Sequence, residues 1–312
     1  MLLSIVVICY NKQSEIAGCL ESVINQLTTD IELIILDDAS KDFSQKTICE
    51  LLSRNDNSEI RFYAGSKNRG VSRMRNLGIR LALGDYIHFL DGDDQFCEGY
   101  LQTLMSVLLR IKPDIVSTQG RWKNSKKVRP PIGCYNGLLI ESRCLGCYKV
   151  SQPIKMMERY LALGGSQVAF AKKAIGNARF EEKETMFEDF DFYFQWISNY
   201  TKWHYLENVW VEYDDNPMES LSRSRTFKQW NAPKAIAHAP SSIIRKRLFS
   251  IWILSACTRQ NALASISFLI DKKSELIYAG INRYTIGSIA MILRNSIKYF
   301  KKCLSISDQS KN

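Results

Sequence analysis

One segment constrains the fold and chemistry of this chain more than any other, the stretch Asp85-Tyr-Ile-His-Phe-Leu-Asp-Gly-Asp-Asp94. An apolar run that suits a buried strand leads directly into four residues, three of which are carboxylates. In open α/β sheets, ligands collect beyond the carboxyl ends of the strands, so we expect these acids at a ligand-binding edge. Carboxylates at i and i+2 suit hard divalent cations such as Mg²⁺ or Mn²⁺, which prefer oxygen ligands. An acidic turn between a strand and a helix is the simpler alternative.

A second acidic cluster follows an earlier apolar run. Ile31–Leu36 has the composition of a strand buried on both faces, and Asp37-Asp38-Ala-Ser-Lys-Asp42 comes straight after it. Two adjacent carboxylates are costly there unless they are hydrated or hydrogen-bonded, which favours contact with a base or a ribose. The alternative is that one of them caps the helix predicted to begin near Phe43. We expect one of the pair to serve each role.

A third cluster lies in Phe187-Glu-Asp-Phe-Asp-Phe-Tyr-Phe-Gln-Trp196, where acids alternate with bulky aromatic residues at the start of a predicted helix. A carboxylate held against apolar surface has a raised proton affinity, which suits a general base. An acidic first turn that complements the helix dipole would give the same pattern.

The N-terminal segment Leu2–Asn11 predicts a buried strand, and an amphipathic helix follows it at once. The apolar face of that helix consists of Ile16, Cys19, Leu20, Val23, Ile24 and Leu27. A dinucleotide-binding domain would place G-x-G-x-x-G in the turn between them, and the sequence has no such run there. The pattern therefore argues against a nicotinamide or flavin enzyme and for another mode of nucleotide binding.

These segments, in this order, resemble the family 2 glycosyltransferases over about residues 1–225. The matching motifs are Val6-Val-Ile-Cys-Tyr-Asn11, Asp37-Asp-Ala-Ser-Lys-Asp42, Asn68-Arg-Gly-Val-Ser-Arg-Met-Arg-Asn76, Asp91-Gly-Asp-Asp94 and Glu188-Asp189. Ala39 replaces a glycine that the family carries in the second motif. Gly164–Phe170 also resembles the acceptor-side strand of the family.

The resemblance implies an α/β fold of the GT-A type, a Rossmann-like mixed and mostly parallel sheet flanked by helices. It implies a catalytic domain over 1–225, with a nucleotide-binding half in 1–120 and an acceptor-binding half in 121–225. Residues 226–312 are then a basic, amphipathic, helical C-terminal region. Within the first half, Ser72 is predicted to cap a helix whose apolar stripe is Met74, Leu77 and Leu81 and which stops at Gly84.

By the same resemblance, the chain is an inverting glycosyltransferase that uses Mn²⁺ or Mg²⁺ and a nucleotide-sugar donor, with a uridine diphosphate sugar expected. Asp93 is the implied principal metal ligand and Asp91 lies near metal and ribose. Asp189 is the implied catalytic base, and Glu188 orients the base or the acceptor. The implied donor-binding residues are Ile8, Tyr10, Asn11, Asp38, Arg75, Asp91, Gly92, Arg223 and Arg225.

Further arguments concern the three arginines of this set. Arg75 would lie near a helix N-terminus on the nucleotide side, where its guanidinium pairs with a phosphate or a carboxylate, unless it is a solvated surface residue. Many family members carry a His before a Ser-x-Ser segment after the base. The matching stretch Asp214–Arg225 has no His, so Arg223 or Arg225 is the candidate for binding the diphosphate.

The positive charge of the chain is concentrated at its C-terminal end. Residues 221–312 hold 16 Lys and Arg against 3 Asp and Glu, a net charge of +13, whereas the rest of the chain sums to −3. Arg245–Leu254 and Ile286–Lys302 predict basic amphipathic helices that are too short to span a bilayer. Such helices suit an anionic membrane surface, although packing on the catalytic domain with solvated charges is the alternative. Nucleic acid is a weaker option, because no nucleic-acid module accompanies the charge.

The remaining features favour a cytoplasmic protein. The nine cysteines include one isolated C-x-x-C pair, Cys144–Cys147, which does not predict a zinc site, and no signal-peptide pattern is present. Arg121–Pro131 is expected to be a basic loop. The setting we expect is bacterial surface polysaccharide assembly, such as O-antigen or capsule, on an undecaprenyl diphosphate carrier, with the enzyme peripheral on the inner face of the cell membrane.

Two other protein classes are weighed against this one. A sugar nucleotidyltransferase would open with a Gly-rich triphosphate loop followed by Lys or Arg, and Lys12 alone is weak support for that. A non-catalytic sugar-nucleotide-binding protein would not need Asp189 beside an intact metal motif.

Overall fold

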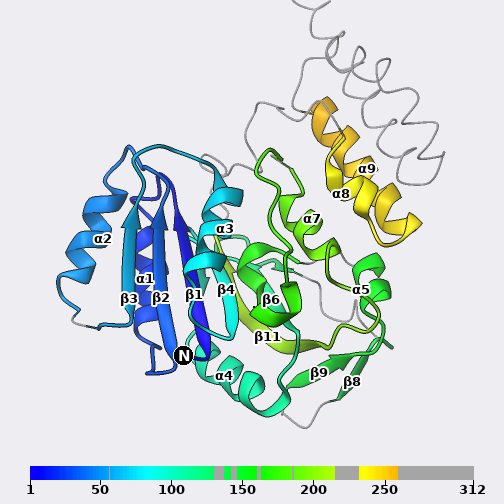
Figure 1. Cartoon of the computed structure of the whole chain (residues 1–312), viewed down its shortest axis with the longest axis horizontal. Coiled ribbons are helices and arrows are strands. Elements are labelled where there is room, and N and C mark those ends of the chain that lie inside the picture. The colour runs from blue at the N-terminus through cyan, green and yellow to red at the C-terminus, as the bar shows by residue number, and fades with distance from the viewer. Residues whose placement is uncertain are drawn as a thin grey trace, which may run out of the picture. The chain divides into compact units, whose positions relative to one another are not determined.

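The computed structural model describes residues 1–55, 57–129, 137–141, 146–159, 163–184, 186–214 and 232–258 (Figure 1). The chain divides into two compact units, of which the first contains 1–182 and 188–215 and the second contains 183–187 and 216–312. The main break between the units thus falls near residue 215, within the acidic stretch that precedes the predicted boundary at 225.

The first unit is built on one large mixed sheet. Its strands run in the order β3-β2-β1-β4-β10-β6-β11-β9-β8, while β5 pairs with β11 and β7 pairs with β6. Their bounds are β1 Leu3–Cys9, β2 Ile31–Asp37, β3 Ile60–Ala64, β4 Tyr86–Asp91, β5 Gln95–Phe96, β6 Ile115–Trp122, β7 Val128–Arg129, β8 Leu139–Glu141, β9 Cys147–Val150, β10 Val168–Ala171 and β11 Trp203–Tyr213.

The strands β3, β2, β1 and β4 lie side by side and are all parallel (Figure 1). The register pairs Ile8 of β1 with Leu36 of β2 and with Asp91 of β4. All seven residues of β1 and of β2 are buried, as expected of parallel strands covered on both faces. The acidic segments that follow β2 and β4 therefore emerge at the same edge of the sheet, which confirms the predicted arrangement.

The sheet continues into a mixed half. β10 is antiparallel to both β4 and β6, and β11 is parallel to β6 and antiparallel to β9. The expectation of a loop over Arg121–Pro131 was wrong within the described part of that segment. Gly120 and Arg121 pair antiparallel with Arg129 and Val128, so β6 and β7 form a hairpin around a basic turn.

Helices and one short 3₁₀ turn accompany the sheet. In the first unit they are α1 Ile16–Ile24, α2 Ser44–Leu52, α3 Val71–Leu81, α4 Tyr100–Ile111, α5 Pro153–Arg159, η1 Gly165–Gln167, α6 Lys172–Ile175 and α7 Glu188–Phe194. The predicted apolar face of α1 is confirmed, because Ile16, Cys19, Leu20 and Val23 are all fully buried in the main hydrophobic core.

The start of α3 differs from the prediction. The capping position is Gly70, at φ 91°, and Ser72 lies inside the helix with a buried hydroxyl that finds no hydrogen-bond partner among the described residues. The buried face runs through Met74, Arg75, Gly78 and Ile79, so Met74 of the predicted stripe is buried as expected, while Leu77 and Leu81 are only half-buried. Gly78 explains the rotation, since a Cβ there would lie 2.6 Å from Cγ1 of Val6. The helix therefore packs its glycine, and not its leucines, against β1.

The described part of the second unit contains α8 Lys234–His238 and α9 Ser242–Thr258. Phe249 and Trp252 of α9 are buried and stack edge to face, with ring centroids 5.6 Å apart. Packing therefore encloses these two aromatic side chains, whereas Lys246 on the same helix is exposed. The second predicted helix, Ile286–Lys302, lies outside the described residues. Among the residues that are described, we find no helix with the length and apolar content to cross a bilayer.

Candidate active site

The loop after β4 brings three carboxylates to the sheet edge. The Gly92 amide donates to the Ile8 carbonyl at 2.9 Å, and the Asp94 amide donates to the Asp91 carbonyl at 2.9 Å, which closes a tight turn. A Cβ at position 92 would lie 3.0 Å from the Ile8 carbonyl oxygen, so the close approach of the two backbones favours glycine there. The acids of the Asp91–Asp94 motif are thus held by the backbone of the neighbouring strand.

Burial and neighbouring charges raise the pKa values of two carboxylates in this loop, Asp91 and Asp94. Asp94 is buried, and its pKa lies well above the ordinary value because of desolvation, with further contributions from Asp93 and Asp91. Ser166 donates to the Asp94 side chain and the Asp214 amide approaches it at 3.4 Å, and both contacts oppose that rise. The pKa of Asp91 is also raised, first by desolvation, although the charge of Arg75 opposes the effect. The cluster therefore has a deficit of positive charge.

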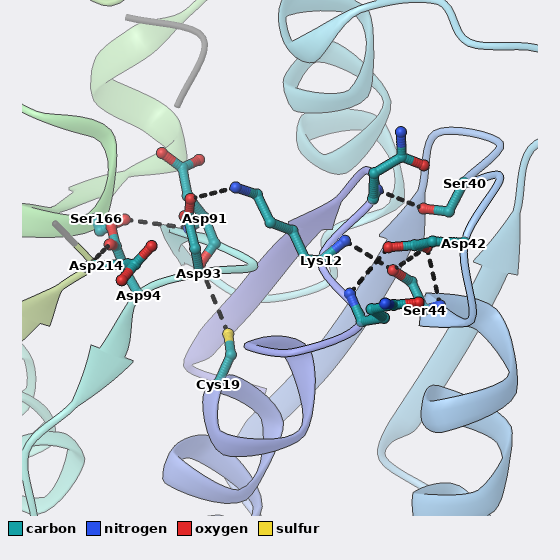
Figure 2. A network of polar contacts seen from close by, with 12 residues as sticks. Lys12, Cys19, Ser40, Asp42, Ser44, Asp91, Asp93, Asp94, Ser166 and Asp214 are labelled. Atoms are coloured by element: carbon teal, nitrogen blue, oxygen red, sulfur yellow. Dashed lines mark hydrogen bonds and ion pairs between the residues drawn. The ribbon is translucent and has the colours of Figure 1, made fainter. Parts of the chain in front are cut away.

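Lys12 supplies one of the cations that face this cluster. It follows β1, and its Nζ lies 2.7 Å from Oδ2 of Asp93 (Figure 2). The two side chains are only 12 % and 23 % exposed, so the pair is largely shielded from water. Lys12 was not among the predicted site residues. The signal that was available is its place directly after the Tyr10-Asn11 motif, at the same sheet edge as Asp93.

Arg75 connects the acidic loop to the third acidic cluster. Its Nη2 donates to Asp91 at 3.2 Å and its Nη1 donates to Glu188 at 3.1 Å. Arg75 is 5 % exposed, and its guanidinium lies 5.4 Å from the centre of the Phe180 ring. The expectation that a carboxylate or phosphate pairs with Arg75 is confirmed, and the alternative of a solvated surface residue is wrong. Residues 113 positions apart in the sequence, Arg75 and Glu188, are thereby brought together.

Asp189 has the electrostatics that a general base requires. It lies in the first turn of α7, beside Glu188, and its Oδ1 accepts a hydrogen bond from the Phe190 amide at 2.8 Å. The pKa of Asp189 is raised to about 7, mainly by desolvation and also by the negative charge of the neighbouring Glu188. Arg75 limits the rise.

The loop after β2 uses its acids differently from the prediction. Both oxygens of Asp38 accept backbone amides, one from Arg69 and one from Gly70, each at 2.7 Å. Asp37 accepts the Ser40 amide at 2.9 Å, whereas Asp42 accepts the amide of Ser44 at the start of α2. The prediction that Asp37 or Asp38 caps α2 was therefore wrong. A turn at positive φ reverses the chain at Ala39, which leaves Asp42 as the acid closest to the helix.

The loops after β1 and β2 are joined by hydrogen bonds at the predicted donor-binding residues. The Asn11 amide donates to Oγ of Ser40 at 2.9 Å, and Oδ1 of Asn11 accepts the Lys41 amide at 2.8 Å. Tyr10 is half-buried beside them and Ile8 is 8 % exposed. The predicted Arg223 and Arg225 lie outside the described residues.

The segment predicted to be the acceptor-side strand also contacts the acids. Oγ of Ser166 in η1 accepts the Asp91 amide at 3.1 Å. A Cβ at Gly165 would lie 2.9 Å from Nη2 of Arg75, so the absence of a side chain leaves space for the guanidinium. Ser166 was not among the predicted site residues, since its partner lies 75 residues away in the sequence.

The carboxylates of this loop fit a divalent cation whose remaining coordination positions are filled by a bound substrate. Among the described residues, no group of three or more His, Cys, Asp or Glu is arranged to hold a metal without help. Mg²⁺ is usually held by one or two carboxylates together with substrate phosphates, and Asp91 and Asp93 offer such a pair. The mutual repulsion of the acids in this loop is a further reason for a cation to be stable there.

Comparison with known proteins finds relatives of the N-terminal part of the chain. Residues 4–136 match the family model described as Glycosyl transferase family 2. Glycosyltransferase GlyG of Streptococcus pneumoniae is 33 % identical over 115 residues, which cover 37 % of this chain and 38 % of GlyG. The teichoic acid poly(glycerol phosphate) polymerase of Staphylococcus epidermidis is 40 % identical over 93 residues, 30 % of this chain and 13 % of the polymerase. The matches therefore span less than half the length of these relatives.

Solved structures share the fold. S. aureus TarS 1-349 in complex with UDP-GlcNAc superposes with a TM-score of 0.62 at 17 % identity, covering 95 % of this chain and 82 % of TarS. The mannosyltransferase PcManGT from Pyrobaculum calidifontis, solved with GDP-Man and Mn²⁺, gives a TM-score of 0.56 at 14 % identity over 93 % of this chain and 86 % of PcManGT. Together with the motifs held at the sheet edge, these matches confirm that residues 4–136 resemble the family 2 glycosyltransferases, as predicted, and that the chain has the GT-A fold.

Proposed function

We propose that this protein transfers a sugar, with inversion, from a uridine diphosphate sugar to a hydroxyl of a lipid-linked saccharide. The observation that carries this proposal is the chain of contacts from Asp91 through Arg75 to Glu188, with Asp189 next in sequence. It links acids suited to a donor's metal with a carboxyl whose pKa is about 7. A donor site and a base in direct connection are what a glycosyl transfer requires.

On the donor side, Asp91 and Asp93 would hold Mn²⁺ or Mg²⁺. When bound, such an ion stabilises the negative charge that develops on the departing diphosphate. Tyr10 and Asn11 lie at the same edge, where β1 and β2 end, and are proposed to bind the nucleoside. Asp38 has both oxygens occupied by backbone amides, so its proposed contact with uridine would use the remaining lone pairs.

On the acceptor side, Asp189 is proposed to take the proton from the attacking hydroxyl. The deprotonated oxygen then attacks the anomeric carbon from the face opposite the diphosphate, which inverts the configuration. A base with a pKa near the working pH combines a sufficient ionised fraction with useful basicity. Arg75 restrains Glu188, and that restraint also positions the first turn of α7.

The proposed acceptor is a saccharide on undecaprenyl diphosphate, at the inner face of the cell membrane. Two observations support this setting: a relative that polymerises teichoic acid and the net charge of +13 over 221–312. The donor class is supported by structural neighbours that were solved with UDP-GlcNAc and with GDP-Man. Lys12, the one feature in favour of a nucleotidyltransferase, has Asp93 as its partner, which weakens that alternative.

The proposal is tested by substituting the metal ligand. Asp93→Asn removes one charged oxygen beyond the end of β4, so the fold should persist while transfer falls by at least about two orders of magnitude. Transfer and calorimetric binding are to be measured against a panel of nucleotide sugars with Mn²⁺.

The matched control is Asp85→Asn, an exposed acid at the other end of the same segment, which should keep full activity. Undiminished transfer by Asp93→Asn, or full activity of the wild type in excess EDTA, would contradict the metal assignment.

A further inference from the structure

We propose that Lys12 is a built-in cation that holds the metal position at Asp93 until a divalent ion displaces it. The proposal rests on the proposed metal-dependent function and concerns how the site is loaded. The ammonium and the Asp93 carboxylate are 2.7 Å apart, so a divalent ion and the ammonium cannot both occupy the same side of Oδ2.

The backbone of Lys12 is fixed, which limits where its side chain can reach. Its amide donates to Oγ of Ser44 at 2.7 Å, and that hydroxyl donates in turn to Asp42. Its carbonyl accepts the amides of Glu15 and Ile16 at the start of α1, at 3.1 and 2.8 Å. Figure 2 shows the side chain extending from this anchored turn to the acidic loop. The ion pair is therefore a consequence of the fold and not of a freely moving surface lysine.

The local charges explain why a resident cation is needed. Asp91, Asp93 and Asp94 lie within one four-residue turn, so three carboxylates repel one another at close range. Arg75 faces Asp91, whereas Lys12 faces Asp93. Without a metal, the ammonium offsets the repulsion at Asp93. A divalent ion that arrives alone must break this largely shielded ion pair, and breaking such a pair is costly.

This exchange makes metal and donor binding depend on each other. A nucleoside diphosphate brings negative charge to the same turn, so an ammonium that the metal has displaced gains a new anionic partner. Metal alone is then bound weakly, and metal with diphosphate is bound strongly. By thermodynamic linkage, each ligand increases the affinity of the other by the same factor, and Lys12 contributes to that factor.

The test is Mn²⁺ binding to Lys12→Met, measured by electron paramagnetic resonance without any nucleotide. The Kd for Mn²⁺ alone should fall about tenfold, because the metal no longer competes with an ammonium. The factor by which UDP strengthens Mn²⁺ binding should shrink. Without metal, the unfolding temperature of the variant should fall below that of the wild type, and Mn²⁺ should restore it.

Two controls separate competition at Asp93 from a general change in charge. Lys46→Met removes the same charge from an exposed pair with Glu50 on α2 and should leave Mn²⁺ affinity unchanged. Lys12→Arg keeps the charge and should bind Mn²⁺ nearly as the wild type does. In an Asp93→Asn background, Lys12→Met should no longer improve Mn²⁺ binding, since the contested ligand is gone.

An unchanged or weaker Mn²⁺ affinity in Lys12→Met would overturn the proposal, as would an equal gain in Lys46→Met. Failure of the proposed function has a different signature. In that case Mn²⁺ and UDP would bind with the Lys12 dependence described above, while no nucleotide sugar supported transfer.

Discussion

At the scale of single residues, the site depends on how few cations face many acids. The single residue Arg75 contacts both Asp91 and Glu188. Burial alone would lower the pKa of Arg75, but the charges of these acids more than offset burial and raise it. The charge of Arg75 offsets only part of the rise in the pKa of Asp189. Asp189 therefore combines a buried position with incomplete charge compensation, which is the physical origin of its pKa of about 7.

The pH dependence of transfer follows from that value. Below pH 7 the Asp189 carboxyl binds a proton and cannot accept another from the acceptor, so kcat/KM should fall about tenfold per pH unit on the acid side. Above pH 7 the carboxylate form predominates and the rate should level off. The measurement is kcat/KM for transfer between pH 5 and 9 at saturating metal.

Asp189→Asn should keep donor affinity, lose about 10² or more in turnover and abolish this inflection. Glu188→Gln is the matched control, and normal turnover by Asp189→Asn together with a loss in Glu188→Gln would move the base by one residue.

At the scale of elements, short loops position the residues of the site, and one of these loops has a strained backbone. Ala39 adopts φ 60°, in the left-handed region where the family carries glycine. A side chain there costs about 1–2 kcal/mol in backbone strain, whereas glycine loses about 0.5–1 kcal/mol of chain entropy on folding. The turn between β2 and α2 therefore stores strain beside the nucleotide edge.

Ala39→Gly should raise the free energy of unfolding by up to about 1 kcal/mol, because relief of strain exceeds the entropy cost. Urea denaturation followed by circular dichroism gives the value. Ala17→Gly in α1 is the matched control, since Ala17 lies in a right-handed helix and the same change should destabilise the protein by about 0.5–1 kcal/mol. A loss of stability in both variants would show that the turn at Ala39 is not strained.

At the scale of the whole molecule, negative and positive charges are concentrated in different parts of the chain. The acids collect at the sheet edge of the first unit, while residues 221–312 carry the net charge of +13. The burial of Phe249 and Trp252 leaves basic side chains such as the exposed Lys246 to carry any attraction to lipid. Each basic residue near an anionic surface contributes about 1 kcal/mol, so several suffice for reversible attachment.

The protein should therefore cosediment with anionic liposomes at low salt and be released as salt is raised, because exposed charges are screened. Replacing Lys298, Lys301 and Lys302 by Glu should weaken this attachment without changing donor binding. The same three changes at Lys123, Lys126 and Lys127, exposed in the turn between β6 and β7, form a control of equal charge. Equal partitioning of wild type and tail variant would assign the tail to packing.

The sequence by itself determined the sheet edge and the resemblance of residues 4–136 to family 2 glycosyltransferases. Apolar runs such as Ile31–Leu36 predict buried parallel strands, and the acids that follow must then emerge together, because strand direction fixes where each strand ends. Only the tertiary structure decided the partners. Lys12 with Asp93 and Arg75 with Glu188 join residues 81 and 113 positions apart, and no local pattern encodes a contact made through space. The same holds for α3, where Gly78 packs against Val6, Leu77 and Leu81 stay half-buried, and the predicted cap at Ser72 is not formed.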